Sequence, residues 1–213
     1  MAVDVSTPKT RTRLLEAAAE LFAEKGFNGT TVRDICHRAE ANVAAVNYHF
    51  KNKRQLYDAV IRTAIEFALH SFPLNPPRRI QPTPEERLYH FVLAFLRRRL
   101  DKNRPDWQRR LLMREMANPG PGTRSLVAEI VERNHDLLLG IVREILHQHH
   151  ATANDRQLHL VMASIVGQCL FFQPGHFALQ SIHRHLDLSQ RGLPGIARHI
   201  TDFSLAAIRG LHS

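Results

Sequence analysis

One stretch, residues 30–53, constrains the fold more than any other part of the chain; it reads TTVRDICHRAEANVAAVNYHFKNK. Thr31 followed three residues later by Asp34 forms a capping-box pattern, in which the hydroxyl accepts a backbone N–H and the carboxylate faces the positive end of a helix. Asn42 is a favoured N-cap for a second helix over residues 43–50. The stretch therefore predicts two short helices joined by a tight turn.

The second helix is expected to have two chemically different faces. Three apolar residues recur at three- and four-residue spacing and are expected to share the buried face: Val43, Val46 and Phe50. The opposite face is uncharged, small near its start and aromatic later: Ala44, Ala45 and Tyr48, flanked by Asn47 and His49. Such a face suits the recognition helix of a DNA major-groove reader, because alanine methyls can meet a thymine methyl and Asn47 can read a base edge or hold a phosphate. Several donors and cations are expected at the phosphates: Tyr48, His49, Lys51, Lys53 and Arg54.

These residues resemble the N-terminal domain of TetR-family transcriptional regulators. The resemblance is carried by residues 30–35 and 42–53 and extends over roughly residues 8–70; the Asn-Val-Ala-Ala-aliphatic-Asn-Tyr-His-Phe variant resembles the CecR-like branch. It implies that the DNA-binding residues are Thr31, Arg33, Asn42, Val43, Ala44, Ala45, Asn47, Tyr48, His49 and Lys53. Two positions depart from the family pattern: Glu40 stands where most members have glycine, and Asn47 stands where tyrosine is common.

Composition places few limits on the function. The chain has 213 residues, which suffice for one large or two small domains, and its 44% hydrophobic content is ordinary for a globular protein. No apolar run approaches the roughly 20 residues of a membrane helix, and no charged-then-apolar leader opens the chain, so we expect a cytoplasmic protein without a membrane partner. The two cysteines, Cys36 and Cys169, lack metal-ligand spacing, which is consistent with a reducing compartment.

The net charge supports a nucleic-acid partner only locally. The whole chain carries +9, but residues 1–71 carry only +2 of it. The positive charge of the predicted DNA-binding part is local, in residues 9–13 and 51–54. Arg11 and Arg13 are expected either to reach the DNA backbone or to be ordinary solvated charges.

The hydrophobic periodicity predicts an all-α protein. The family resemblance implies that it consists of an N-terminal three-helix helix-turn-helix DNA-binding domain and a C-terminal helical ligand-binding and dimerisation domain. The expected domains are residues 1–70 and 85–213, joined by a proline-rich linker over residues 71–84. Besides the two short helices of residues 30–53, helices are expected at residues 8–25, 54–69, 85–102, 105–117, 124–147, 155–172 and 194–211. A further short helix is expected to end near residue 186. Breaks are expected at residues 118–122 and 173–175.

Two helices are assigned to self-association through the family resemblance, which implies a four-helix homodimer interface from residues 155–172 and 194–211. A small-residue flank on the first, Ala163, Ser164 and Gly167, permits close approach of another helix. The alternative is that these apolar faces close the core of the monomer. A two-fold dimer would read a palindromic double-stranded DNA operator with two heads.

A small-molecule effector pocket is expected among the helices of residues 85–172. Asn134 is the first candidate, because a polar group within an apolar stripe needs a partner. The further candidates are Trp107, Met116, Gln168 and Phe171. For each of them, an interhelical hydrogen bond or ordinary packing is the alternative.

The histidines raise a metal hypothesis, since His147, His149 and His150 cluster at one helix end, with His183 and His185 later in the chain. No cysteine or carboxylate accompanies them at fixed spacing, and a helix C-terminus favours charged histidines in any case.

The chain shows no enzyme motif and implies no cofactor. The sequence therefore predicts a homodimeric repressor released by a small molecule. The alternatives are a helical protein-interaction module and a metal-responsive repressor using the histidine cluster.

Overall fold

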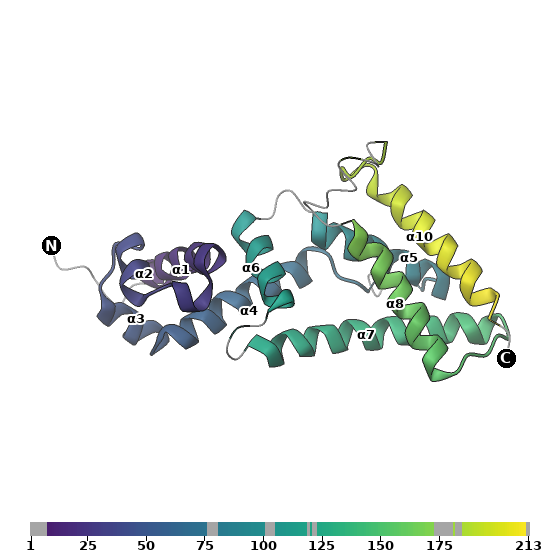
Figure 1. Ribbon diagram of the computed structural model, residues 1–213, viewed down its shortest axis with the longest axis horizontal. Helices are drawn as coiled ribbons and strands as arrows, with labels where there is room; N and C mark the ends of the chain where they lie inside the picture. Colours follow the sequence, from purple (N-terminus) through teal and green to yellow (C-terminus); the bar gives the residue numbers. More distant parts are fainter. Residues whose placement is uncertain are drawn as a thin grey trace. The chain divides into compact units, whose positions relative to one another are not determined.

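The computed structural model of this chain describes residues 8–75, 81–100, 105–118, 120, 123–172, 181 and 185–211. All the regular structure in these residues is helical, which confirms the predicted fold class (Figure 1). The contacts divide the chain into two compact units. Unit 1 consists of Met1–Ala68 together with Asn103–Glu129, and unit 2 consists of Leu69–Lys102 together with Ile130–Ser213.

In its described residues, unit 1 contains four complete helices and parts of two others. The complete helices are α1 (Pro8–Gly29), α2 (Val32–Arg38), α3 (Val43–Phe50) and α6 (Asp106–Ala117). Most of α4 (Lys53–Ser71) and the start of α7 (Thr123–Gln148) also belong to it. Helix α1 contacts α2, α3 and α6, so it is the central element of the unit.

The predicted stop of α1 at Gly26 is confirmed as a break in the helical backbone. Gly26 has φ 72° and ψ 179°, a conformation that is essentially restricted to glycine. A Cβ atom added there would also lie 3.0 Å from the Arg114 guanidinium carbon. The break is held by Thr30, whose fully buried hydroxyl lies 2.8 Å from the Gly26 carbonyl oxygen and 3.2 Å from that of Leu21.

The core of unit 1 is built mainly from α1 and α4. The apolar stripe of α4 is buried at Leu56, Tyr57, Val60, Ile61 and Ala64. An aromatic cluster joins the two helices, with the Phe22 and Tyr57 ring centroids 4.8 Å apart at an interplanar angle of 87°. This edge-to-face packing fixes α4, which directly follows the recognition helix, against α1.

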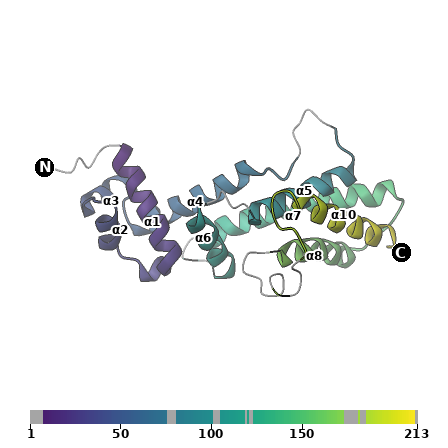
Figure 2. The ribbon, with the colours of Figure 1, turned by 90° about the horizontal axis from the view of Figure 1, so that it is seen from above.

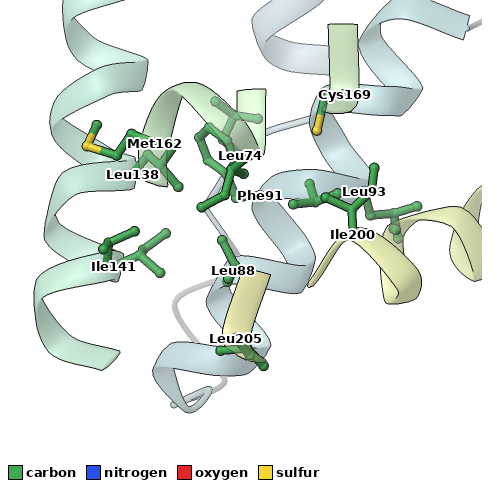
Figure 3. Close-up of a cluster of buried hydrophobic side chains, with 14 of the residues drawn as sticks. Leu74, Leu88, Phe91, Leu93, Leu138, Ile141, Met162, Cys169, Ile200 and Leu205 are labelled. Carbon is green, nitrogen blue, oxygen red and sulfur yellow. The ribbon is translucent and has the colours of Figure 1, made fainter. Parts of the chain in front are cut away.

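Unit 2 packs α5 (Pro84–Leu100), α8 (Asp155–Phe171) and α10 (Leu193–Arg209) with the remainder of α7. Helix α10 lies against both α5 and α8 (Figure 2). Figure 3 shows the core, in which side chains from all four helices meet: Leu88 and Phe91 of α5, Leu138 and Ile141 of α7, Met162 and Cys169 of α8, and Ile200 and Leu205 of α10. The long helices of this unit agree with the sequence prediction to within two residues wherever both ends are described.

The division into units differs from the predicted domain boundaries in one respect. The sequence places residues 103–129 in the C-terminal domain, whereas their contacts group them with the N-terminal helices. Some expectations fall outside the described residues, wholly or in part: the proline-rich linker, the breaks at residues 118–122 and 173–175, and the short helix ending near residue 186. Within the described residues, no helix is long and apolar enough to cross a membrane.

Candidate nucleic-acid interface

Helix α2 begins with the predicted capping box. The Asp34 N–H donates to the Thr31 hydroxyl oxygen at 3.1 Å, and the Thr31 N–H donates to the Asp34 carboxylate at 3.0 Å. The Thr31 hydroxyl and backbone N–H together lower the pKa of the Asp34 carboxyl, which therefore carries its charge at the positive end of the helix. Ile35 of this helix and its C-cap residue Ala39 are buried.

The turn between α2 and α3 requires a left-handed residue, and that residue is Glu40, with φ 47°. The Ala41 N–H donates to the Cys36 carbonyl at 2.9 Å, which closes the turn. The turn thus forms with glutamate at the position where the family pattern has glycine. An L-residue in this conformation costs roughly 1–2 kcal/mol of stability.

Helix α3 is capped by Asn42, as predicted, since its side-chain oxygen accepts the Ala45 N–H at 2.9 Å. The predicted faces are partly wrong. Val46 and Phe50 are buried, but Ala45 has 0% exposure and Val43 is 45% exposed. Because successive residues turn by roughly 100° around a helix, the buried face is centred between Val46 and the half-buried His49, which includes Ala45 and leaves Val43 at its edge.

The exposed face of α3 now consists of four residues without charge: Val43, Ala44, Asn47 and Tyr48. Tyr48 is 67% exposed, and its ring meets that of His49 edge-on with centroids 4.9 Å apart. Ala45 cannot offer its methyl group to DNA, because the side chain is fully covered by protein. It therefore leaves the set of candidate base contacts, while its N–H remains engaged by the cap.

His49 is only partly available to a phosphate. Its ring lies between those of Tyr48 and Phe50, and its Nε2 atom is buried without a hydrogen-bond partner among the described residues. A phosphate contact from this residue would therefore have to use Nδ1 in this conformation.

Lys53 is used differently from the sequence prediction. Its ammonium donates to the Phe27 and Thr30 carbonyls, each at 2.9 Å, and lies 4.2 Å from the centroid of the Phe27 ring. In this conformation two of the three ammonium donors already bind the segment between α1 and α2, and one donor is left for a phosphate. The α4 lysine instead fixes the backbone just before the α2 cap.

The other cationic side chains near α2 and α3 differ in whether they are paired with an acidic or aromatic group. Arg33 and Lys51 are exposed, and neither forms an ion pair with a described residue. Arg54 lies 3.6 Å from Asp58, and Arg13 lies 4.0 Å from Glu40. The Arg11 guanidinium lies over the Phe50 ring at 5.2 Å. Arg33 and Lys51 are therefore the cations of this region best placed to neutralise phosphate.

A buried carboxylate that the sequence did not single out ties three helices together. Glu115 of α6 is only 2% exposed and accepts hydrogen bonds from the Tyr57 hydroxyl, the Thr123 hydroxyl and, at 2.8 Å, the Gly120 N–H. Burial, together with the hydrogen bond to Glu115, raises the pKa of the Tyr57 hydroxyl, which therefore stays protonated and donates. In the sequence, the sign of this cluster is an acidic residue, Glu115, near the end of a helix whose neighbouring residues Leu111 and Leu112 are apolar.

The predicted effector-binding residues are divided between the two units. Trp107 and Met116 lie on α6 in unit 1, where Trp107 is half-buried and Met116 is 54% exposed. Asn134, Gln168 and Phe171 lie in unit 2 and are half-buried. The Gln168 amide donates to the Ser164 carbonyl of its own helix at 3.4 Å.

The histidine cluster has no described ligand set for a metal ion. Among the described residues, no group of three or more His, Cys, Asp and Glu side chains is arranged to hold one. His149 instead lies 3.2 Å from Glu85 and 3.4 Å from Arg209, so it joins the ends of α5 and α10. His183 lies outside the described residues.

This region has two short capped helices joined by a tight turn, and the exposed face of the second helix carries no charge. These are the features of a helix-turn-helix DNA-binding protein. Residues 14–60 match the family model of bacterial regulatory proteins, tetR family, and residues 84–208 match that of the HTH-type transcriptional dual regulator CecR, C-terminal domain. The chain therefore belongs to the TetR family of transcriptional regulators, in its CecR-like branch. As predicted, this is a family of regulators and not of enzymes.

Curated relatives match this chain over only part of its length. The chain is 42% identical over 52 residues to the probable HTH-type transcriptional regulator YttP of Bacillus subtilis, covering 24% of this chain and 25% of that protein. It is 26% identical over 84 residues to the biofilm operon icaADBC HTH-type negative transcriptional regulator IcaR of Staphylococcus aureus, covering 39% and 44% respectively. The matches thus span less than half the length of these relatives.

Solved structures extend the likeness in fold to nearly the whole chain. The TetR-family regulator PfmR from Thermus thermophilus has a TM-score of 0.61 at 21% identity, covering 95% of this chain and 97% of its own. A putative fatty acid metabolism regulator of Clostridium perfringens has a TM-score of 0.60 at 19% identity, covering 89% and 97%. At these identities the likeness concerns the fold alone.

Proposed function

We propose that this regulator is a homodimeric repressor that binds a palindromic operator through α2 and α3 and is released by a small-molecule ligand. The observation that carries the DNA part is the exposed face of α3. It presents Val43, Ala44, Asn47 and Tyr48, while the cap and the buried face hold the helix in place. Small and apolar side chains suit thymine methyl groups, and the Asn47 amide suits the edge of adenine.

Exposed apolar side chains on α8 and α10 support the dimer. Leu160 is 57% exposed and Phe203 is 59% exposed, although both helices also contribute to the core of unit 2. Beside Leu160, α8 exposes Ala163 and Gly167, and no described atom lies within 4 Å of a Cβ built on Gly167. Two copies of this surface would bury the apolar residues about a two-fold axis, which would set two reading heads against a palindrome.

Repression and release are the parts of the proposal that rest on family likeness. The name of IcaR describes a negative regulator, and that of the CecR model describes a dual one. Release requires a ligand that binds more tightly to a conformer that does not fit the operator, and linkage then weakens DNA binding by the same factor.

The test is selection of bound duplexes from a random DNA pool by the purified protein, with its mass measured by light scattering. We expect a dimer and an enriched palindrome. Asn47→Ala should relax the preference at one position of each half-site, whereas Tyr48→Phe should weaken binding to all duplexes about equally, because it removes a phosphate contact. A monomer that enriches no sequence would contradict the proposal.

A further inference from the structure

The guanidinium of Arg99, in unit 2, meets no acceptor among the described residues. Arg99 lies in the last turn of α5 and is half-buried. Its guanidinium lies over the ring of Phe95, with the central carbon 5.2 Å from the ring centroid. Among the residues that the structure describes, none accepts a hydrogen bond from Arg99 or pairs with its charge.

Two other half-buried arginines of the same helix, Arg87 and Arg98, are bound by acceptors of the protein. Arg87 reaches the Glu144 carboxylate at 2.5 Å, which joins α5 to α7. Arg98, the neighbour of Arg99, donates from Nε to the Phe72 carbonyl at 2.7 Å. Folding of unit 2 thus uses these two guanidinium groups and leaves that of Arg99 available.

The surroundings of Arg99 make its unpaired charge costly. Burial lowers the pKa of the Arg99 guanidinium, and the ionisable group that acts on it is the Cys169 thiol of α8. Cys169 is fully buried, and this burial raises its pKa to about 12. The thiol is therefore neutral near pH 7 and offers no countercharge. An arginine remains protonated even so, which leaves one desolvated positive charge beside an aromatic ring.

We propose that Arg99 is the anion-binding group of the effector site, and that the effector is an organic monocarboxylate with an apolar body. One guanidinium balances one negative charge, and its planar fork matches the two oxygens of a carboxylate. An apolar body suits the partly buried hydrophobic residues that pack on the core of this unit, which include Phe72, Phe95, Leu100 and Phe172. This inference rests on the proposed ligand-responsive function and supplies its ligand class.

The unpaired charge gives the proposal a signature in the ligand-free protein. Replacing Arg99 by an uncharged residue of similar length removes a desolvation penalty without breaking a contact to an acceptor. Arg99→Met should therefore raise the melting temperature of the full chain by about 2 °C or more. A fall of that size would show that a protein group pairs with Arg99, and would overturn the proposal.

Ligand binding is tested by calorimetry with matched acid and amide probes, decanoate with decanamide and 2-naphthoate with 2-naphthamide. At least one acid should bind the wild-type protein roughly tenfold or more tightly than its amide, which is the size expected for a charge-assisted hydrogen bond. Arg99→Met should abolish this preference, and Arg99→Lys should retain part of it. Arg97→Met removes a charge from the same helical turn and should leave the preference unchanged.

The test separates this inference from the proposed function. Calorimetry needs no DNA, and operator selection needs no ligand. Equal binding of acids and amides, no binding of any acid, or a preference that survives Arg99→Met would overturn the monocarboxylate site, while a recovered palindrome would still support the repressor. Conversely, an acid preference that depends on Arg99 would support the site even if no palindrome were recovered.

Discussion

Unit 1 and unit 2 are both helical, but different interactions hold them together. The DNA-reading part of unit 1 contains helices of only 7 and 8 residues, fixed by caps and by polar contacts from Thr31, Asn42 and Lys53. Unit 2 is formed by helices of 17 residues and part of one of 26, which enclose a continuous apolar core.

This difference follows from helix length. Isolated helices shorter than roughly 12–15 residues are marginal in water, so α2 and α3 depend on individual hydrogen bonds for their geometry. The long helices of unit 2 bury whole stripes, and their stability is spread over many non-directional contacts. Single substitutions should therefore affect stability most in unit 2, and the geometry of the reading head most in unit 1.

The largest expected effect is a core truncation in unit 2. Leu88→Ala should lower the free energy of unfolding by about 2–5 kcal/mol, because Leu88 is fully buried in the core of this unit. Leu186→Ala is a matched control at a side chain that is 41% exposed, and should cost about 0.5 kcal/mol or less. Chemical denaturation measures both; equal costs would contradict the packing described for unit 2.

Lys53→Ala tests whether unit 1 depends on directed hydrogen bonds. It should lower stability by about 1–3 kcal/mol, because two carbonyls in the Phe27–Thr30 segment lose their donor. DNA affinity should fall with it, but the dependence of log affinity on log salt should keep its slope, since no phosphate contact is lost.

Lys51→Ala provides the contrasting control for Lys53. Lys51 is exposed and unpaired among the described residues, so its removal should leave stability unchanged and reduce the salt slope by about 0.9 for one lost phosphate contact. Titrations of DNA at several salt concentrations distinguish the two variants. A reduced slope in Lys53→Ala would assign that lysine to the phosphates after all.

Asn42→Ala should have a smaller effect, about 1 kcal/mol, because it leaves the Ala45 N–H without its cap. Asn42→Asp retains the acceptor and should remain close to wild type in thermal unfolding. If both variants lost the same stability, the amide and not the cap would be the stabilising feature.

The sequence predicted the contacts of unit 1 that are local and missed those that are not. Both helix caps join residues only three apart, so side-chain chemistry and spacing were sufficient to predict them. Lys53 binds carbonyls 23 and 26 residues away, and Glu115 binds the Tyr57 hydroxyl 58 residues away, so these contacts depend on how α4 and α6 pack. The positions of Val43 and Ala45 could not be assigned either, because spacing gives the period of a helical face but not its centre.

In unit 2, the helical period predicted the elements and most of the core. It could not distinguish an apolar stripe that closes the monomer from one that remains exposed, and α8 and α10 contain both kinds: Met162 and Ile200 are buried, while Leu160 and Phe203 are exposed. Asn134 is the first effector candidate because it is a polar residue within an apolar stripe. That criterion does not select Arg99, the proposed anion-binding group, because an arginine in the last turn of a helix is ordinarily explained by the helix dipole.

The smallest expected effect concerns the turn between α2 and α3, where Glu40 has φ 47°. Glu40→Gly should raise the free energy of unfolding by up to about 1 kcal/mol, because relief of the left-handed strain exceeds the entropy that glycine adds to the unfolded chain. Glu40→Ala retains the Cβ atom and should not be stabilised. Its loss of the Arg13 contact costs little, since that pair is exposed and 4.0 Å apart. Thermal unfolding compares the three proteins, and a stabilised Glu40→Ala would show that the carboxylate, not the backbone conformation, is the unfavourable feature of this turn.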